Sequence, residues 1–353
     1  MNYYKVIRPL LFKLPPEFMH SSIVSILKMI DNICPSALNL FAKKYMVYDE
    51  SLNQELLGNY FANPVGLAGG YDKNGNIIRP IASLGFGFLE FGTFTPLAQK
   101  GNKKPRLFRL VEQESLQNAM GFNNIGKKKI ISNISKIYPF VLPLGANIGK
   151  NKTTSNNKAI KDYIDLLNSF KDLCDYFIIN ISSPNTNNLR DLQNIDFISN
   201  LMQEAKTITQ KSILIKIAPD MNEKDALDLC YGALKAGVSG FIIANTSIDY
   251  TLINNSKTFG GISGKLITKK NATFFKILAK ELYGKTILIA SGGIDNANEA
   301  YDRIKDGANL IQIYTALIYK GPSLIYNINK GLIELLKKDG FANISEAVGI
   351  NLK

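Results

Sequence analysis

The chain has 353 residues, with 42 lysines and arginines against 29 acidic residues, one histidine and three cysteines. A hydrophobic share of 46% excludes a disordered protein, and widely spaced cysteines disfavour a disulfide framework, a zinc ribbon and an iron–sulfur cluster, so no metal site is expected. The net charge of +13 raises the question of a nucleic acid or an anionic membrane as partner.

Residues 1–50 read as an amphipathic helical segment that differs from the rest of the chain. Apolar residues recur at helical spacing before Pro15-Pro16, after it, and again from Leu38 to Tyr45. No run reaches the ~18 apolar residues that span a bilayer, and charged residues interrupt any secretory signal. Two interpretations stay open for these stripes: packing on the protein's own core, or docking on a bilayer surface with lysine and arginine at the headgroups.

From residue 64 onward, short apolar runs alternate with stretches of helical periodicity such as Ala159–Leu173, Glu223–Ala236 and Thr268–Tyr283. The runs are Pro64–Gly69, Gly87–Thr93, Val141–Ile148, Asp175–Ser182, Ile213–Ala218, Gly240–Thr246, Thr286–Gly293 and Leu310–Ala316. Eight repeats of strand and helix predict a (β/α)8 TIM barrel rather than a doubly wound sheet. We expect residues 51–353 to form this barrel as the catalytic domain, with residues 1–50 as a small N-terminal helical extension.

Two further features accompany the repeats. Gln54–Leu57, a Gly58-Asn59 turn and Tyr60–Ala62 predict a small hairpin that closes the barrel floor. The connections after Thr93 and after Thr246 are too long for simple crossovers. Insertions of this kind usually carry function.

The carboxyl ends of the predicted strands, where barrels assemble their active sites, are polar. Gly292-Gly293 and Tyr314-Thr315 follow the last two strands and indicate a phosphate pocket built from backbone N–H groups. Gly260-Gly261 and Gly264 add backbone donors from the second insertion. Lys216, inside the otherwise apolar run Ile213–Ala218, is placed to offset negative charge on a reduced cofactor ring.

The fourth predicted strand ends in the run Asn180–Thr186, NISSPNT. Asparagine offers donors and acceptors without charge, which suits the amide and carboxylate edges of a small ring. Ser183 lies on a proline-stiffened loop between two asparagines, and a serine acts as a base only through a relay or a strongly assisted proton transfer. Taken alone, such a run is typically a turn.

Ordered strings at these strand ends are spread along the chain from residue 63 to residue 314. They are NPVGLAGGYDKNG (63–75), GFGFLEFGTFTP (85–96), GNKKPRLFRL (101–110), MGFNN (120–124), NIGKNK (147–152), NISSPNT (180–186), KIAPD (216–220), GGISG (260–264), SGGID (291–295) and QIY (312–314). With these strings and its helical N-terminus, the chain resembles class 2, quinone-dependent dihydroorotate dehydrogenases over essentially its whole length.

The resemblance implies oxidation of dihydroorotate to orotate in pyrimidine (UMP) synthesis, with a bound FMN. The residues that it assigns to the flavin are Gly69, Gly70, Thr93, Asn147, Asn180, Lys216, Gly264, Gly293, Tyr314 and Thr315. Those that it assigns to the substrate are Lys73, Asn118, Gly121, Phe122, Asn185, Asn245 and Thr246.

The same resemblance implies catalytic roles. Ser183 is the base that removes the C5 proton while the C6 hydride passes to flavin N5, Thr186 is its relay partner, and Lys73 pairs with the substrate carboxylate. His20, in a Pro-Glu-x-x-His pattern, lines the quinone tunnel with Arg109 and Tyr314. Two residues depart from the family's usual strings: Ala119 replaces a common arginine, and Ala244 replaces a threonine that often precedes Asn245.

Two rival functions stand beside this one. Class 1-type enzymes, which use fumarate or NAD, have a cysteine as base, and no cysteine falls on the Ser183 loop. An RNA-binding flavoprotein barrel would explain the +13, but that family relies on a catalytic cysteine and an RNA-binding extension, and we find neither. We therefore expect no nucleic acid and no obligatory protein subunit. The expected place is the cytoplasmic face of a bacterial membrane, with peripheral contact through the N-terminal helices.

Overall fold

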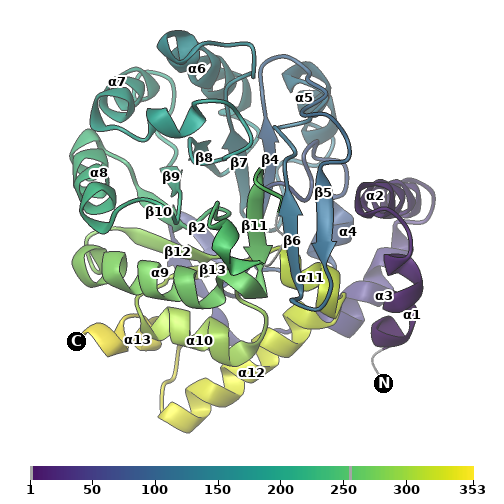
Figure 1. Ribbon diagram of the computed structural model, residues 1–353. Helices are drawn as coiled ribbons and strands as arrows, with labels where there is room; N and C mark the ends of the chain where they lie inside the picture. Colours follow the sequence, from purple (N-terminus) through teal and green to yellow (C-terminus); the bar gives the residue numbers. More distant parts are fainter. Residues whose placement is uncertain (1–2, 254–256) are drawn as a thin grey trace.

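The computed structural model describes residues 3–253 and 257–353 (Figure 1). Eight parallel strands form a closed barrel: β3 (Val65–Leu67), β4 (Phe88–Phe94), β7 (Leu144–Ile148), β8 (Tyr176–Asn180), β9 (Ile213–Ile217), β10 (Gly240–Ile243), β12 (Ile287–Ser291) and β13 (Leu310–Ile313). The strands pair in chain order, and β13 closes the ring on β3. The predicted (β/α)8 barrel is therefore confirmed, with each strand lying inside its predicted run or within one residue of it.

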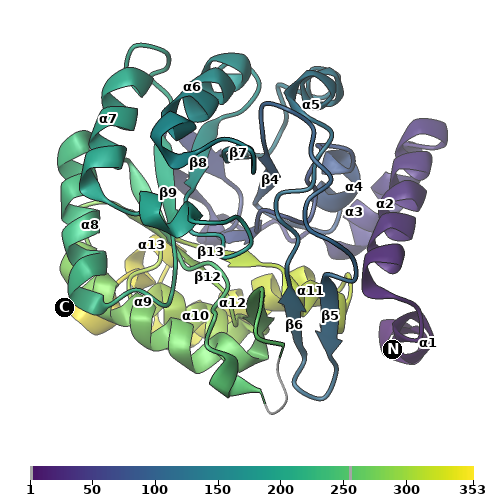
Figure 2. The same cartoon turned by 45° about the horizontal axis from the view of Figure 1, so that its top comes forward.

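Helices follow the strands and pack around the outside of the barrel (Figures 1 and 2). They are α4 (Ile78–Ala82), α5 (Lys127–Ile134), α6 (Ala159–Phe170), α7 (Ile195–Ala205), α8 (Glu223–Ala236), α9 (Thr268–Leu282), α10 (Ala297–Lys305), α11 (Thr315–Lys320), α12 (Leu324–Asp339) and α13 (Ile344–Ala347). Asparagine side chains cap the starts of α7, α8 and α10, satisfying backbone N–H groups that the helices leave free. At its other end α8 stops at Gly237, whose φ of 98° is left-handed.

The predicted floor hairpin is also present. β1 (Gln54–Leu56) pairs antiparallel with β2 (Asn59–Phe61). Phe61 is fully buried and packs edge-on against Phe88, with ring centroids 5.5 Å apart. Both rings belong to an apolar cluster with Tyr176, Leu214 and other inward-facing strand residues. This plug closes one end of the barrel and leaves the polar carboxyl ends as the open end.

The two long insertions meet over that open end. The first holds β5 (Leu107–Leu110) and β6 (Ser115–Asn118), and the second holds β11 (Gly261–Gly264). These strands form one antiparallel sheet in the order β11-β6-β5, visible in front of the barrel in Figure 1. We call residues 97–124 the insertion arm.

The N-terminal segment folds as α1 (Tyr3–Phe12), α2 (Pro16–Ile33) and α3 (Ser36–Tyr45), beside α4 and β5 (Figure 2). Tyr4 donates a hydrogen bond to the carbonyl of Ile318 at 2.6 Å, and Arg8 donates one to the carbonyl of Tyr319 at 2.9 Å. These contacts fix α1 to α11 of the barrel. No single helix among residues 3–253 and 257–353 is long and apolar enough to cross a membrane, although α2 and α3 together, bent by 116°, meet that criterion of length and composition.

Candidate active site

One cavity of about 460 Å³ extends from α1 and α2 to the carboxyl ends of the barrel strands. Its wall contains nearly all of the predicted site residues: Gly69, Gly70, Lys73, Thr93, Asn118, Gly121, Phe122, Asn180, Ser183, Asn185, Lys216, Asn245, Thr246, Gly264, Gly293, Tyr314 and Thr315, with His20 and Arg109 at the outer end. Two predicted residues, Asn147 and Thr186, are buried behind this wall. The fold therefore brings the predicted flavin, substrate and quinone residues to one continuous space.

A buried carboxylate lies beneath the wall. Glu90 is fully buried on β4, and its Oε1 lies 3.6 Å from the ammonium of Lys216 on β9. The carboxylate accepts hydrogen bonds from the side-chain amides of Asn147 and Gln312. A charge in the interior is tolerated when it is paired and hydrogen-bonded, and Glu90 meets both conditions. This network fixes Lys216 at the centre of the barrel mouth.

Asparagine amides continue the network toward the cavity. Asn180 donates to Thr93 Oγ1 at 2.8 Å and to Asn147 Oδ1 at 3.2 Å, and Thr93 also donates to Asn147. Asn245 donates to Ser182 Oγ at 2.9 Å. Asn147 thus connects Thr93 and Asn180 to the buried carboxylate of Glu90.

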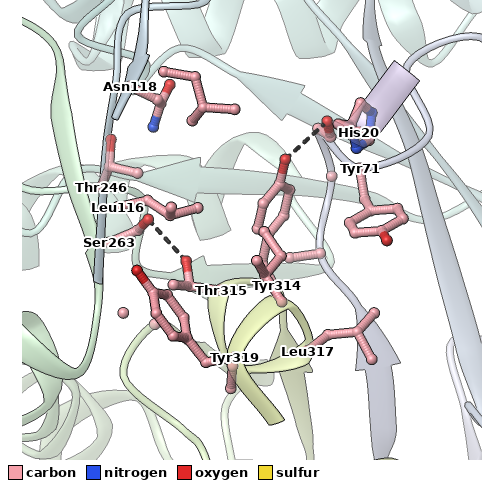
Figure 3. A pocket seen from close by; sticks show the side chains of 18 of the residues that line it. His20, Tyr71, Leu116, Asn118, Thr246, Ser263, Tyr314, Thr315, Leu317 and Tyr319 are labelled. Carbon is pink, nitrogen blue, oxygen red and sulfur yellow. Dashed lines mark hydrogen bonds between the residues drawn. The ribbon is translucent and has the colours of Figure 1, made fainter. Parts of the chain in front are cut away.

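Glycines shape the end of the cavity beside β12, β13 and β11. Gly293 has a φ of 80°, and a Cβ there would lie 2.4 Å from Thr268 Cα, so a side chain is excluded. Gly264 has a φ of 99°, and its neighbour Ser263 shares a 2.9 Å hydrogen bond with Thr315 (Figure 3). Bare backbone and hydroxyls at this place match what a phosphate group requires.

The substrate end is rich in amides. Asn185 donates to Asn118 Oδ1 at 3.0 Å, while its own Oδ1 is buried without a hydrogen-bond partner among the described residues. The backbone N–H of Asn185 donates to Ser183 Oγ at 3.3 Å. Thr186 Oγ1 is likewise buried and unpaired within the described part of the chain, so the structure contains no direct hydrogen bond from it to Ser183. Buried oxygens that have no hydrogen-bond partner in the protein indicate that a ligand or a water molecule donates hydrogen bonds to them.

Lys73 faces the same space from the loop after β3. Its ammonium donates to the carbonyl of Gly70 at 2.6 Å. The pKa of Lys73 is lowered to about 8, because burial and the positive charge of Arg106 together outweigh the opposing effects of Glu17 and Asp72. A cation that lacks a full counter-charge suits an anionic substrate group.

An aromatic path leads from the barrel mouth to α2. Tyr314 donates to the carbonyl of Gly70 at 3.3 Å, and its ring lies 5.6 Å from that of Tyr71 (Figure 3). His20 on α2 packs edge-on against Tyr71 at 5.2 Å. Burial, with the nearby charge of Lys73, lowers the pKa of His20 to about 3, so the imidazole is neutral at physiological pH. Arg109 holds the α1–α2 linker by donating to the carbonyls of Phe12 at 3.2 Å and Leu14 at 2.7 Å.

Comparison with known proteins decides the family. The family model for dihydroorotate dehydrogenase matches residues 51–336. The chain belongs to the dihydroorotate dehydrogenase family. It is 53% identical over 350 residues to the dihydroorotate dehydrogenase (quinone) of Sulfurovum sp., and 52% identical over 350 residues to that of Nitratiruptor sp., with 99% of each chain covered in both cases. The crystal structure of DHODH from Eimeria tenella in complex with ferulenol matches with a TM-score of 0.80 and 32% identity, covering 97% of this chain and 98% of that one.

Four residues of this quinone-type dihydroorotate dehydrogenase have structural roles that the sequence did not predict: Glu90, Gln312, Arg106 and Tyr71. The role of Glu90 could have been predicted, because it is the only charged residue in the apolar run that forms β4. Of the two departures, Ala119 is buried and its N–H donates to the carbonyl of Arg106 at 2.8 Å. Ala244 is buried at the end of β10, where its N–H donates to Ser291.

Proposed function

We propose that this quinone-type dihydroorotate dehydrogenase oxidises dihydroorotate to orotate in pyrimidine synthesis, with FMN as its flavin and a membrane quinone as final acceptor. The single observation that supports this most directly is the continuous cavity, which joins the amide-lined Ser183 loop to the apolar wall of α1 and α2. A substrate and a lipid-soluble acceptor can therefore reach one flavin from two chemically different ends.

The residues present fit FMN. A phosphate fits the glycine-shaped end at Gly264 and Gly293, where a Cβ would collide with backbone. An isoalloxazine ring fits the mouth over Lys216, whose ammonium opposes the negative charge of a reduced flavin, with Asn180 and Thr93 as hydrogen-bonding partners. When bound, FMN supplies the acceptor for the hydride of dihydroorotate.

The chain's own groups would carry the rest of the first half-reaction. Lys73 pairs with the substrate carboxylate. Asn118, Asn185 and Asn245 form hydrogen bonds with the amide groups of the substrate ring. Ser183 removes the C5 proton, because the N–H of Asn185 stabilises negative charge on its Oγ. Thr186, whose hydroxyl is buried and unpaired among the described residues, completes a proton relay through a bound water.

The outer end of the cavity fits a quinone. Met19, Ile23 and Leu27 of α2 contribute apolar walls, and neutral His20, Arg109 and Tyr314 contribute the polar groups. Away from the cavity, the N-terminal segment exposes large apolar side chains: Val6, Ile7, Leu10, Leu14, Phe18, Ile26, Met29, Ile33 and Leu40. Exposed lysines such as Lys13 and Lys43 accompany them. This combination supports peripheral attachment to an anionic leaflet, at the cytoplasmic face of the cell membrane.

Anaerobic rapid mixing tests the proposal. Dihydroorotate alone should bleach the flavin absorbance without any nicotinamide, and a short-chain quinone should restore it. Fumarate and NAD, offered as alternative acceptors, should restore it far more slowly. A flavin that stays oxidised with dihydroorotate, or one that fumarate or NAD reoxidises faster than quinone, would contradict the proposal.

A further inference from the structure

Glu17 and Arg106 form an ion pair between the N-terminal segment and the insertion arm. Glu17 lies in the first turn of α2, and Arg106 immediately precedes β5. Arg106 Nη2 lies 2.6 Å from Glu17 Oε1, and Nε lies 3.2 and 3.3 Å from the two carboxylate oxygens. The side chain of Arg106 is only 5% exposed and that of Glu17 is 20% exposed. Although burial acts to raise it, the pKa of Glu17 is lowered because Arg106 and Lys104 stabilise the carboxylate.

The remaining nitrogen of the same guanidinium holds the insertion arm together. Arg106 Nη1 donates to the carbonyls of Lys100 at 2.6 Å, Asn102 at 2.9 Å and Met120 at 3.4 Å. The carbonyl of Arg106 accepts from the N–H of Ala119. Because Met120 and Ala119 lie between Asn118 and the pair Gly121-Phe122, Arg106 sets the position of a stretch assigned to the substrate.

The connection continues to the loop of the proposed base. Asn102 donates from its side chain to the carbonyl of Asn185 at 2.9 Å, two residues from Ser183. Asn102 also packs under Gly121, where a Cβ would lie 2.9 Å from its amide. A chain of direct contacts therefore runs from Glu17 through Arg106 and Asn102 to the Ser183 loop.

Glu17 itself begins the helix that lines the outer cavity. His20, Ile23 and Leu27 follow it on α2 and face the same cavity. A second carboxylate of α2, Asp31, also pairs with the barrel, through Arg79 of α4 at 3.9 Å, but that pair lies away from the insertion arm. The helix thus has two ionic anchors, of which Glu17 alone is joined to the substrate end.

We propose that Glu17 is a positioning residue, which through Arg106 holds the insertion arm closed over orotate or dihydroorotate and so couples the substrate end of the cavity to the position of α2. The proposal rests on the proposed function, since it requires these ligands at the Ser183 loop. Coupling of this kind is reciprocal: if Glu17 tightens orotate binding, bound orotate must stabilise α2 by the same factor. A ligand at the substrate end of the cavity then changes the affinity for a ligand at the α2 end, and the reverse also holds.

The test compares Glu17→Gln with the matched control Asp31→Asn, both as oxidised holoenzymes without turnover. Titration calorimetry with orotate should show about tenfold weaker binding for Glu17→Gln, within the usual range of coupling between sites, and near wild-type binding for Asp31→Asn. Hydrogen exchange of α2 should slow when orotate is added to the wild type and to Asp31→Asn. This slowing should be absent in Glu17→Gln.

Further variants separate positioning from loss of folding. Glu17→Asp, which keeps the charge, should recover part of the orotate affinity. Arg106→Lys keeps the positive charge but loses the guanidinium group that donates to three carbonyls. It should therefore weaken orotate binding as Glu17→Gln does. Wild-type orotate affinity in both Glu17→Gln and Arg106→Lys, or orotate-dependent protection of α2 retained in them, would overturn the coupling. Failure of the wild type itself to bind orotate would contradict the proposed function instead.

Discussion

The backbone N–H of Asn185 donates a hydrogen bond to the hydroxyl oxygen of Ser183, with a nitrogen–oxygen distance of 3.3 Å. The neighbouring Ser182 already accepts from Asn245, so the two adjacent serines have different partners. A donor aimed at Ser183 Oγ favours the oxygen when it carries negative charge, which a base needs. Ser183 is therefore the serine of this loop that is both exposed to the cavity and electrostatically assisted.

Replacing Ser183 with alanine should slow flavin reduction by dihydroorotate about 10²–10⁴-fold, the usual contribution of a positioned general base. Bound FMN should remain, because Ser183 lies among the substrate groups. Stopped-flow absorbance of the flavin measures the rate, and the visible spectrum reports the cofactor content. Thr186→Val should slow the same step by a smaller factor. If Ser183→Ala reduced the flavin at the wild-type rate, Ser183 would not be the base. If Thr186→Val did so, Thr186 would not belong to the proton relay.

Replacing Glu90 with glutamine should destabilise the barrel, because it leaves the Lys216 ammonium buried without its counter-charge. Removing one partner of a buried pair costs about 3–5 kcal/mol of the free energy of unfolding. Urea unfolding followed by circular dichroism measures this loss, with Glu55→Gln, a change at an exposed carboxylate of β1, as the control. A loss no larger than that of the control would show that Lys216 does not depend on Glu90.

The barrel could be predicted from the sequence because parallel strands that are buried on both faces consist of continuous apolar residues. Such runs recur along this chain with helical stretches between them. The strand ends then located most of the cavity wall. The sheet of β5, β6 and β11 could not be predicted, because its pairing of Ser115 with Gly264 joins two insertions far apart in the chain. The same limit hid the pair of Glu17 and Arg106, 89 residues apart. Asn147 shows a third limit: its strand position was evident, but only the structure shows that its side-chain amide donates to Glu90.

Lys73 predicts a pH dependence for substrate capture. Its pKa of about 8 lies below that of an ordinary lysine because of burial, so the free enzyme loses this positive charge as the pH rises through about 8. The substrate carboxylate binds the protonated form, and kcat/KM for dihydroorotate, which reports the free enzyme, should fall above that pH. Lys73→Arg should abolish this falling limb, since arginine stays charged. An identical limb in the variant would assign the titration to another group.

Arg109 predicts a defect confined to the quinone half-reaction. Its guanidinium donates to the carbonyls of Phe12 and Leu14 and lies 4.5 Å from the centre of the Phe12 ring, so it fixes the linker at the outer end of the cavity. Arg109→Ala should raise the KM for a short-chain quinone about tenfold, because the variant loses the charge-assisted hydrogen bond that Arg109 is proposed to donate to the quinone, which is worth about 1.5 kcal/mol. Flavin reduction by dihydroorotate, measured without quinone, should stay near the wild-type rate, as should both half-reactions in the control Lys13→Ala, an exposed lysine of the same linker. If Arg109→Ala slowed flavin reduction as much as reoxidation, Arg109 would act on the whole cavity and not on its quinone end.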